Sequence, residues 1–211
     1  MANGPFAGLD VNALRTLAPH GALRSSPRRT VIVEEGDNSD SLYVVLSGRV
    51  KAFARDAEGK EVVFSTMGAG DYFGELVLDG GPRSASVVTL EACRFFVIPR
   101  GDVEGMLEAN PAFARHLINA LIARVRSLSG KVFDLALKDV YGRFVRFVEE
   151  NAIEHGGKRV VPERLTQHDI AARIGGSREM ISRILKELTT GGYISIDAKR
   201  ITLHRKLPRN R

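Results

Sequence analysis

Hydrophobic positions along the chain follow a helical spacing first, then a strand-like one, and then a helical one again. Residues 9–18 carry apolar side chains three and four apart, and Pro19 ends that predicted helix. From about residue 31 to residue 99, short β-rich runs alternate with glycines. Strands of this length and spacing predict an antiparallel roll or sandwich.

One long helix is predicted over residues 111–137, with Pro111 acceptable in its first turn. Apolar side chains recur along it at the three-four spacing of a coiled-coil seam. The seam consists of Ala114, Leu117, Leu121, Val125, Leu128, Val132 and Leu135. Such a seam predicts either a homodimer or a helix packed on its own β domain, and we favour the homodimer.

The last third of the chain predicts three helices and a hairpin. Residues 140–155 form an amphipathic pattern that Gly156 and Gly157 end. Residues 165–204 then read as a short helix, a Gly-Gly turn, a second helix and two short strands. A helix-turn-helix followed by a hairpin is a winged DNA-binding motif.

Local signals mark the ends of the two motif helices. Thr166 and Asp169 have the spacing of a capping box, and Ser177 is placed to cap the second helix. The apolar side of the second helix is predicted to bury four residues, Ile181, Ile184, Leu185 and Leu188. Its opposite side carries Arg178, Glu179, Ser182, Arg183 and Lys186.

This polar side suits the reading of base pairs. Arginine pairs with guanine through two hydrogen bonds, and glutamate accepts from cytosine. Glu179 among basic residues favours base reading, since a surface that binds only phosphates would exclude a carboxylate. Lys199, Arg200 and Arg205 on the predicted hairpin are expected to contact backbone phosphates.

The distribution of charge supports a polyanionic partner for the same third. Residues 1–138 carry 16 Lys and Arg against 16 Asp and Glu, whereas residues 139–211 carry 15 against 9. The net charge of +6 therefore lies in the last third, as expected of a nucleic-acid-binding domain.

Composition narrows the class of protein. The hydrophobic fraction of 44% suits a globular core, and the chain has no apolar run long enough to span a membrane. Its first residues lack the basic and apolar regions of a secretory signal. The single Cys93 forms no internal disulfide and cannot hold an iron–sulfur cluster alone. A cytoplasmic protein is expected.

The stretch of residues 74–88, GELVLDGGPRSASVV, carries the clearest chemistry of the first two thirds. Gly74 permits a close approach of backbone and ligand. Glu75 can accept a hydrogen bond from a ribose hydroxyl. Arg83 offers a planar fork of donors to a phosphate, and Ser84 adds a hydroxyl and a backbone N–H.

This stretch resembles the phosphate-binding cassette of cyclic-nucleotide-binding domains. The order EEGD, SLYVVLSGRV, GDYFGEL and GPRSASV is similar to the β-roll of those domains, and SREMISR is similar to the SRE-x-x-SR recognition helix of bacterial regulators. The whole chain resembles transcription factors of the cAMP receptor protein / fumarate-nitrate regulator (CRP/FNR) family.

The resemblance implies an α+β protein with three parts. Residues 1–110 would form a jelly-roll-like, cyclic-nucleotide-binding β-roll. Residues 111–138 would form a dimerisation helix and hinge, and residues 139–211 a winged helix-turn-helix that binds DNA. A homodimer through the helix of residues 111–137, double-stranded DNA with a TGTGA-like palindrome and RNA polymerase are the partners that the family implies.

The resemblance also assigns residues to the ligand. Gly74 and Glu75 would contact the ribose, and Arg83 and Ser84 the cyclic phosphate. Leu76 is placed among the ligand-binding residues. Arg124 is predicted to reach Glu75 or the phosphate.

The nucleotide base is assigned to Leu128 and Ser129, where the family's cAMP sensor has a Thr-Ser pair. Leu128 cannot hydrogen-bond the adenine amino group, whereas Ser129 can. The expected effector is cAMP, with cGMP as an alternative and no metal.

The residues also bear on other signals and other classes of protein. The same DNA-binding fold could respond to cyclic di-GMP or act without a ligand. A haem or redox sensor is disfavoured because the roll has no histidine between His20 and His116, and Cys93 lies in an apolar strand. An enzyme is excluded because the histidines are scattered and no nucleophile–base pair or metal-ligand spacing occurs.

Overall fold

The structure, a computed structural model, describes residue 6 and residues 8–208. The chain forms two compact units, residues 1–125 and residues 126–211, and each is described here by itself. The long helix α3 (Pro111–Leu137) contributes to both units. None of the helices in the described part of the chain is long and apolar enough to cross a membrane.

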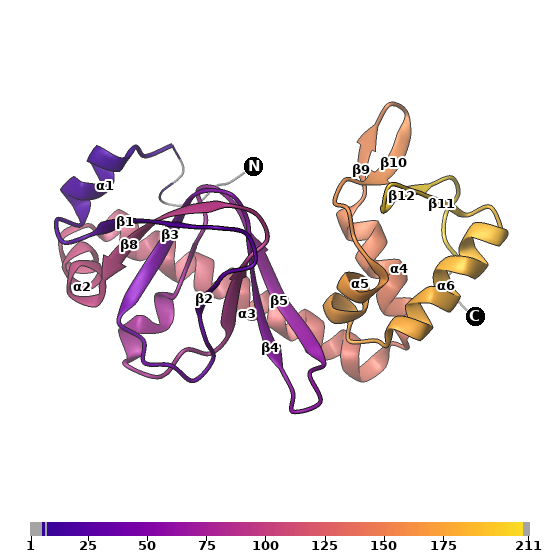
Figure 1. Cartoon of the computed structure of the whole chain (residues 1–211), viewed down its shortest axis with the longest axis horizontal. Helices are drawn as coiled ribbons and strands as arrows, with labels where there is room; N and C mark the ends of the chain where they lie inside the picture. The colour runs from indigo at the N-terminus through magenta and orange to yellow at the C-terminus, as the bar shows by residue number, and fades with distance from the viewer. Residues whose placement is uncertain (1–5, 7, 209–211) are drawn as a thin grey trace. The chain divides into compact units, whose positions relative to one another are not determined.

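Two four-stranded antiparallel sheets form the roll of the first unit (Figure 1). One sheet has the order β1-β8-β3-β6, from the strands Ala22–Ser26, Cys93–Pro99, Ser41–Ser47 and Tyr72–Phe73. The other has the order β2-β7-β4-β5, from Val31–Val33, Ser86–Thr89, Val50–Arg55 and Glu61–Met67. The predicted α+β fold with a β-roll is confirmed.

The sequence did not reveal strand β1. Four of its five residues are exposed, so it lacks the apolar alternation that marks a strand. It forms because its backbone pairs with β8, with Ala22 opposite Val97 and Ser26 opposite Cys93. The roll therefore begins at Ala22 rather than near residue 31.

Strand β3 is buried on both of its faces, which explains its unbroken apolar run. Tyr43 and Val45 lie in the core between the two sheets. Leu42 and Val44 face a second core, beneath α1 (Val11–Leu17), α2 (Arg100–Ala109) and the start of α3. Helix α2 was not predicted from the sequence.

The predicted seam on α3 needs a correction in its first half. Leu117 is buried in the core of its own unit, and Leu121 packs against that core. The apolar residues left exposed there are Ile118 and Ile122, which continue into Val125 at 62% exposure. The helix must cover the roll with one side, so the free row is shifted from the predicted one. Further along, Leu128, Val132 and Leu135 are exposed as the seam requires.

The predicted helix of residues 140–155 is shorter than expected. Helix α4 ends at Asn151, and β9 (Ile153–His155) pairs with β10 (Lys158–Val161). Gly156 and Gly157 have φ values of 59° and 73° and form the turn of that hairpin. The prediction was wrong because a Gly-Gly pair ends a helix and turns a hairpin equally well.

The winged helix-turn-helix is confirmed. Helices α5 (Gln167–Ile174) and α6 (Arg178–Thr190) are joined at Gly175, whose φ is 69°. The wing strands β11 (Ile194–Asp197) and β12 (Arg200–Leu203) belong to a sheet of order β11-β12-β10-β9. The capping box of Thr166 and Asp169 is formed, and the four apolar residues predicted for α6 are all buried.

Candidate functional sites

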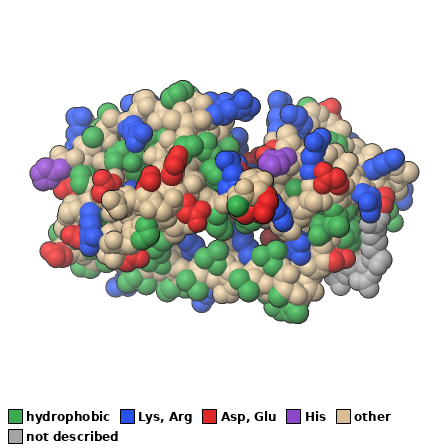
Figure 2. Space-filling view, turned by 60° about the horizontal axis from the view of Figure 1, so that its bottom comes forward, with side chains coloured by type: hydrophobic (Ala, Val, Ile, Leu, Met, Phe, Trp, Pro, Cys, Tyr) green, Lys and Arg blue, Asp and Glu red, His purple; other side chains and the backbone are tan. Residues whose placement is uncertain are grey.

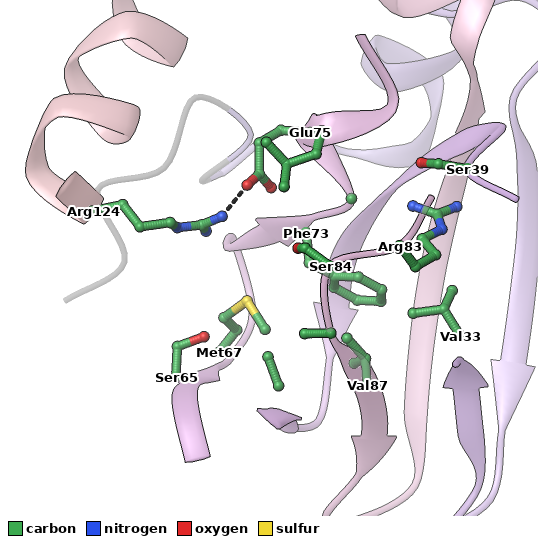
Figure 3. A pocket seen from close by; sticks show the side chains of 14 residues that line it. Val33, Ser39, Ser65, Met67, Phe73, Glu75, Arg83, Ser84, Val87 and Arg124 are labelled. Atoms are coloured by element: carbon green, nitrogen blue, oxygen red, sulfur yellow. Dashed lines mark hydrogen bonds and ion pairs between the residues drawn. The ribbon is translucent and has the colours of Figure 1, made fainter. Parts of the chain in front are cut away.

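One cavity in the first unit is lined by all the ligand-site residues that were predicted within that unit (Figure 3). These are Gly74, Glu75, Leu76, Arg83, Ser84 and Arg124. The cavity has a volume of about 70 Å³ and opens to solvent. Its apolar lining consists of Val33, Ala52, Met67, Phe73, Ala85 and Val87. A charged end beside an apolar wall suits a ligand with an anionic group and a flat organic part.

Gly74 holds the conformation on which this geometry depends. Its φ is 86°, in the left-handed region, and it precedes the short helix η1 (Glu75–Asp79). A Cβ at this position would lie 2.6 Å from Arg83 Nη1 and 2.8 Å from the carbonyl oxygen of Ser41. Any side chain here would therefore collide with the arginine of the cassette.

Arg83 is a buried cation, and one of its nitrogen atoms is an unpaired hydrogen-bond donor among the described residues. Its side chain is 5% exposed, and its guanidinium lies 5.8 Å from the centre of the Tyr43 ring. Nη2 is 3.6 Å from a carboxylate oxygen of Asp40. Nη1 is buried and has no hydrogen-bond partner among the described residues. Leaving a buried donor unpaired costs about 1–3 kcal/mol, and more for a charged one, so Arg83 is poised for an anion.

Glu75 provides the opposite charge in the same cavity. Its side chain is 4% exposed, and its Oε1 is paired with Arg124 Nη1, as drawn in Figure 3. Its Oε2 is buried and has no partner within the described part of the chain. The expected contact between Arg124 and Glu75 is thus formed, and one carboxylate oxygen is left to accept a hydrogen bond.

Tyr72 is a neighbour of this pair that sequence reasoning missed. Its hydroxyl is buried without a partner among the described residues. Burial, with the negative charge of Glu75 next in weight, raises the pKa of Tyr72 to about 12. The phenol therefore stays protonated and neutral at physiological pH.

Two polar residues line the cavity without having been predicted, and the two residues assigned to the base lie outside this unit. Ser39 and Ser65 line the cavity but were not predicted, because neither belongs to the cassette stretch. Leu128 and Ser129 are on the part of α3 that belongs to the second unit. Their assignment to the base stays a prediction.

The predicted DNA-contacting residues of α6 all lie exposed on one side of that helix. They are Arg178, Glu179, Ser182, Arg183 and Lys186. Ser177 caps the helix by accepting from the backbone N–H of Met180. Figure 2 shows Lys and Arg side chains over the visible surface with Asp and Glu among them. The exposure of these five residues leaves this side of α6 accessible to a partner molecule.

The wing brings a second group of basic residues beside the helix-turn-helix. Lys199 and Arg200 are exposed, and the carbonyl oxygen of Lys199 accepts from the backbone N–H of Leu165 at 3.0 Å. A groove beside the wing is lined by Arg178, His168 and Lys199. Sequence reasoning did not place His168 in one groove with these two residues, because the lining of a groove depends on how α5, α6 and the wing pack.

A metal site and a reactive thiol find no structural support. Within residues 6 and 8–208, no group of three or more His, Cys, Asp or Glu is arranged to hold a metal ion. Cys93 is buried in β8, and burial raises the pKa of its thiol. A raised pKa lowers the thiolate fraction and hence the reactivity.

Known proteins match both parts of the chain. Residues 23–110 match the family described as Cyclic nucleotide-binding domain, and residues 142–206 match the Crp-like helix-turn-helix domain. The chain is 30% identical over 205 residues to the CRP-like cAMP-activated global transcriptional regulator of Mycobacterium tuberculosis, covering 95% of this chain and 92% of that protein.

Two further transcriptional regulators are similar to the chain over most of its length. The cAMP-activated global transcriptional regulator CRP of Haemophilus influenzae is 30% identical over 192 residues, which is 88% of this chain and 85% of that protein. A solved structure of the c-di-GMP responsive global regulator CLP of Xanthomonas campestris has a TM-score of 0.79 and 26% identity, covering 93% of this chain and 100% of that one.

A cyclic-nucleotide-binding roll with a winged helix-turn-helix defines a transcriptional regulator rather than an enzyme. The chain belongs to the CRP/FNR family of such regulators, as the resemblance predicted.

Proposed function

We propose that the protein is a homodimeric regulator that binds a cyclic nucleotide in the cavity of its roll and thereby controls binding to a palindromic, TGTGA-like operator. The expected effector is cAMP, with cGMP as the alternative. The observation that carries the proposal is a pair of buried, unpartnered atoms in one cavity, Arg83 Nη1 and Glu75 Oε2. Among the described residues they await an acceptor and a donor, which a nucleotide phosphate and ribose would supply.

The dimer would form along the free apolar row of α3. Ile118, Ile122, Val125 and Val132 are exposed and follow a spacing of four, three and seven residues, which is that of a coiled-coil seam. Val132 is 66% exposed, so burial against a second copy would remove much apolar surface from water. Two copies would present two α6 helices to two half-sites of a palindrome.

Ligand and DNA would be coupled through α3. Arg124 lies on this helix and holds Glu75 of the cavity. A nucleotide that engages Glu75 would change this ion pair and favour one arrangement of the helices over another. Leu128 and Ser129, further along the helix, would contact the base.

The remaining partners follow from the family. A regulator that binds operator DNA would act in the cytoplasm and would contact RNA polymerase. Arg178 and Glu179 would read bases, and Arg183 would read a base or brace a phosphate. Ser182 and Lys186 would lie on the same DNA-contacting side, and Lys199 and Arg200 would hold phosphates.

A second candidate signal is cyclic di-GMP. It is favoured by the similarity to the c-di-GMP responsive regulator, which is 26% identical over the whole of that chain. Binding of DNA without any ligand is the third possibility.

Fluorescence anisotropy of a labelled TGTGA-palindrome duplex distinguishes these cases. The duplex is titrated with protein at fixed salt, without ligand and then with cAMP, cGMP or cyclic di-GMP. Tightening by cAMP or cGMP alone is the expected result. Tightening by cyclic di-GMP alone would transfer the assignment to that signal. Equal binding in all four conditions would overturn the proposal that a ligand controls DNA binding, whereas the DNA-binding function would stand.

A further inference from the structure

Ser39 places a third buried, unpartnered polar atom in the cavity. Its Oγ is buried and has no hydrogen-bond partner among residues 6 and 8–208. Ser39 lines the same cavity as Arg83, and both are labelled in Figure 3. A hydroxyl excluded from water without a partner costs free energy, so its burial beside an unpaired guanidinium nitrogen calls for an occupant with acceptor atoms.

The backbone holds Ser39 at this place independently of its own side chain. The preceding residue, Asn38, forms a β-bridge with Pro82. The backbone N–H of Arg83 donates to the carbonyl oxygen of Asp37 at 2.8 Å. The segment before β3 is therefore attached to the cassette by backbone contacts that do not involve the Ser39 side chain.

Neighbouring acceptors do not satisfy these donors. The Asp40 carboxylate approaches Arg83 Nη2 only to 3.6 Å, and its side chain is 86% exposed. The same carboxylate accepts from the hydroxyl of Ser41 at 2.6 Å. Asp40 therefore offsets the charge of Arg83 weakly and leaves Nη1 and the Ser39 hydroxyl to a ligand.

We propose that Ser39 donates its hydroxyl hydrogen to the same anionic group of the ligand that Arg83 binds. The inference rests on the proposed nucleotide site, and it concerns the phosphodiester oxygens that cAMP, cGMP and cyclic di-GMP share. Ser84, which the resemblance assigns to the phosphate, is an exposed residue, whereas the Ser39 hydroxyl is buried.

Calorimetric titration of the full-length protein with each of the three nucleotides tests this role. Ser39→Ala is expected to weaken binding of the nucleotide that the wild type prefers by about tenfold or more, since a hydrogen bond to a charged group is lost. Ser39→Thr keeps the hydroxyl and is expected to stay within about threefold of the wild type. Ser25→Ala, on the exposed strand β1, is the matched control and should change nothing.

Binding of the uncharged nucleoside distinguishes the loss of a phosphate contact from a change in the structure of the variant. Ser39→Ala should leave the weak affinity for adenosine or guanosine, and the melting temperature, close to those of the wild type. Equal nucleotide affinity in Ser39→Ala and the wild type overturns the assignment while the proposed function stands. A parallel loss of nucleoside affinity also overturns it, because the effect would then not involve the phosphate. A wild type that binds none of the three nucleotides overturns the proposed function and this inference with it.

Discussion

Arg143 donates a hydrogen bond from its Nε to the carbonyl oxygen of Ile174 at 2.7 Å. The same guanidinium donates to the carbonyl oxygens of Gly175 at 3.0 Å and Lys138 at 2.7 Å. One side chain thus satisfies the backbone at the end of α5 and at the residue after α3, where carbonyl groups lack helical partners. The turn of the helix-turn-helix and the connection between α3 and α4 are held together within the second unit.

Substitution of Arg143 should therefore destabilise this unit. Arg143→Ala removes three charge-assisted hydrogen bonds and leaves three backbone carbonyl groups without a protein partner. We therefore expect the free energy of unfolding to fall by about 3 kcal/mol. Urea denaturation of the full chain, followed by circular dichroism, measures the change. Arg164→Ala, at an exposed position, is the control and should lie within about 0.5 kcal/mol of the wild type. An equally small effect for both variants would contradict the bracing role.

Asp134 should make the same connection sensitive to acid. Its carboxylate lies 2.7 Å from Arg146 Nη1 on α4 and 3.0 Å from Lys138 Nζ. Burial acts to raise the pKa of Asp134, but the hydrogen bonds from Lys138 and Arg146 outweigh it, and the net shift is downward. A depressed pKa in the folded state stabilises the protein above the unfolded pKa, and that stability is lost as the pH falls through the folded value.

The corresponding experiment compares Asp134→Asn with the wild type over pH. The variant is expected to be less stable at pH 7. The difference should begin to shrink as the pH falls below about 4, the ordinary pKa range of an aspartate, and should vanish below the depressed folded value. Melting temperatures at matched ionic strength provide the measurement. Glu58→Gln, at an exposed position, serves as the control. A difference that stays constant from pH 7 to pH 3 would show that the carboxylate charge is not responsible.

Two residues that are not glycine have positive φ angles at the tip of the wing. Ala198 and Lys199 have φ values of 45° and 67°, in the left-handed region that disfavours residues with a Cβ. Ala198→Gly relieves this strain and should raise the free energy of unfolding by up to about 1 kcal/mol, although glycine also adds entropy to the unfolded chain. Ala22→Gly in strand β1 lacks the strain and should destabilise by about 0.5–1 kcal/mol. Chemical denaturation of both variants tests the contrast, and a loss of stability in Ala198→Gly would refute it.

The two groups of basic residues should respond differently to substitution. Arg178→Ala removes a base contact and should relax discrimination at one guanine by about 1–3 kcal/mol. Lys199→Ala removes a phosphate contact, so binding should weaken on all DNA sequences and the slope against log salt should fall by about 1. Anisotropy titrations on a matched and a singly mismatched duplex, at two or more salt concentrations, separate the two effects. Equal loss on both duplexes in Arg178→Ala would contradict its role in base reading.

Sequence patterns predicted the structure correctly where a feature depends only on residues close to one another in the chain. The capping box at Thr166, the buried stripe of α6 and the span of α3 depend on neighbouring residues in the chain, so spacing alone predicts them. The Gly156-Gly157 pair was misread because its structure depends on what the flanking residues pair with. Strand β1 was missed for the same reason, since its partner β8 is remote in sequence.

The sequence by itself determined the family, the two kinds of domain and the residue types of the cassette, because those are carried by short motifs with fixed spacing. Only the tertiary structure decided that Leu117 faces the roll, that Arg124 pairs with Glu75 and that Ser39 shares the cavity of Arg83. Each of these depends on segments that meet only when the sheets and helices pack. Burial then decides which polar atoms lose contact with water without gaining a hydrogen-bond partner. The spacing of residues along the chain does not predict which atoms these are.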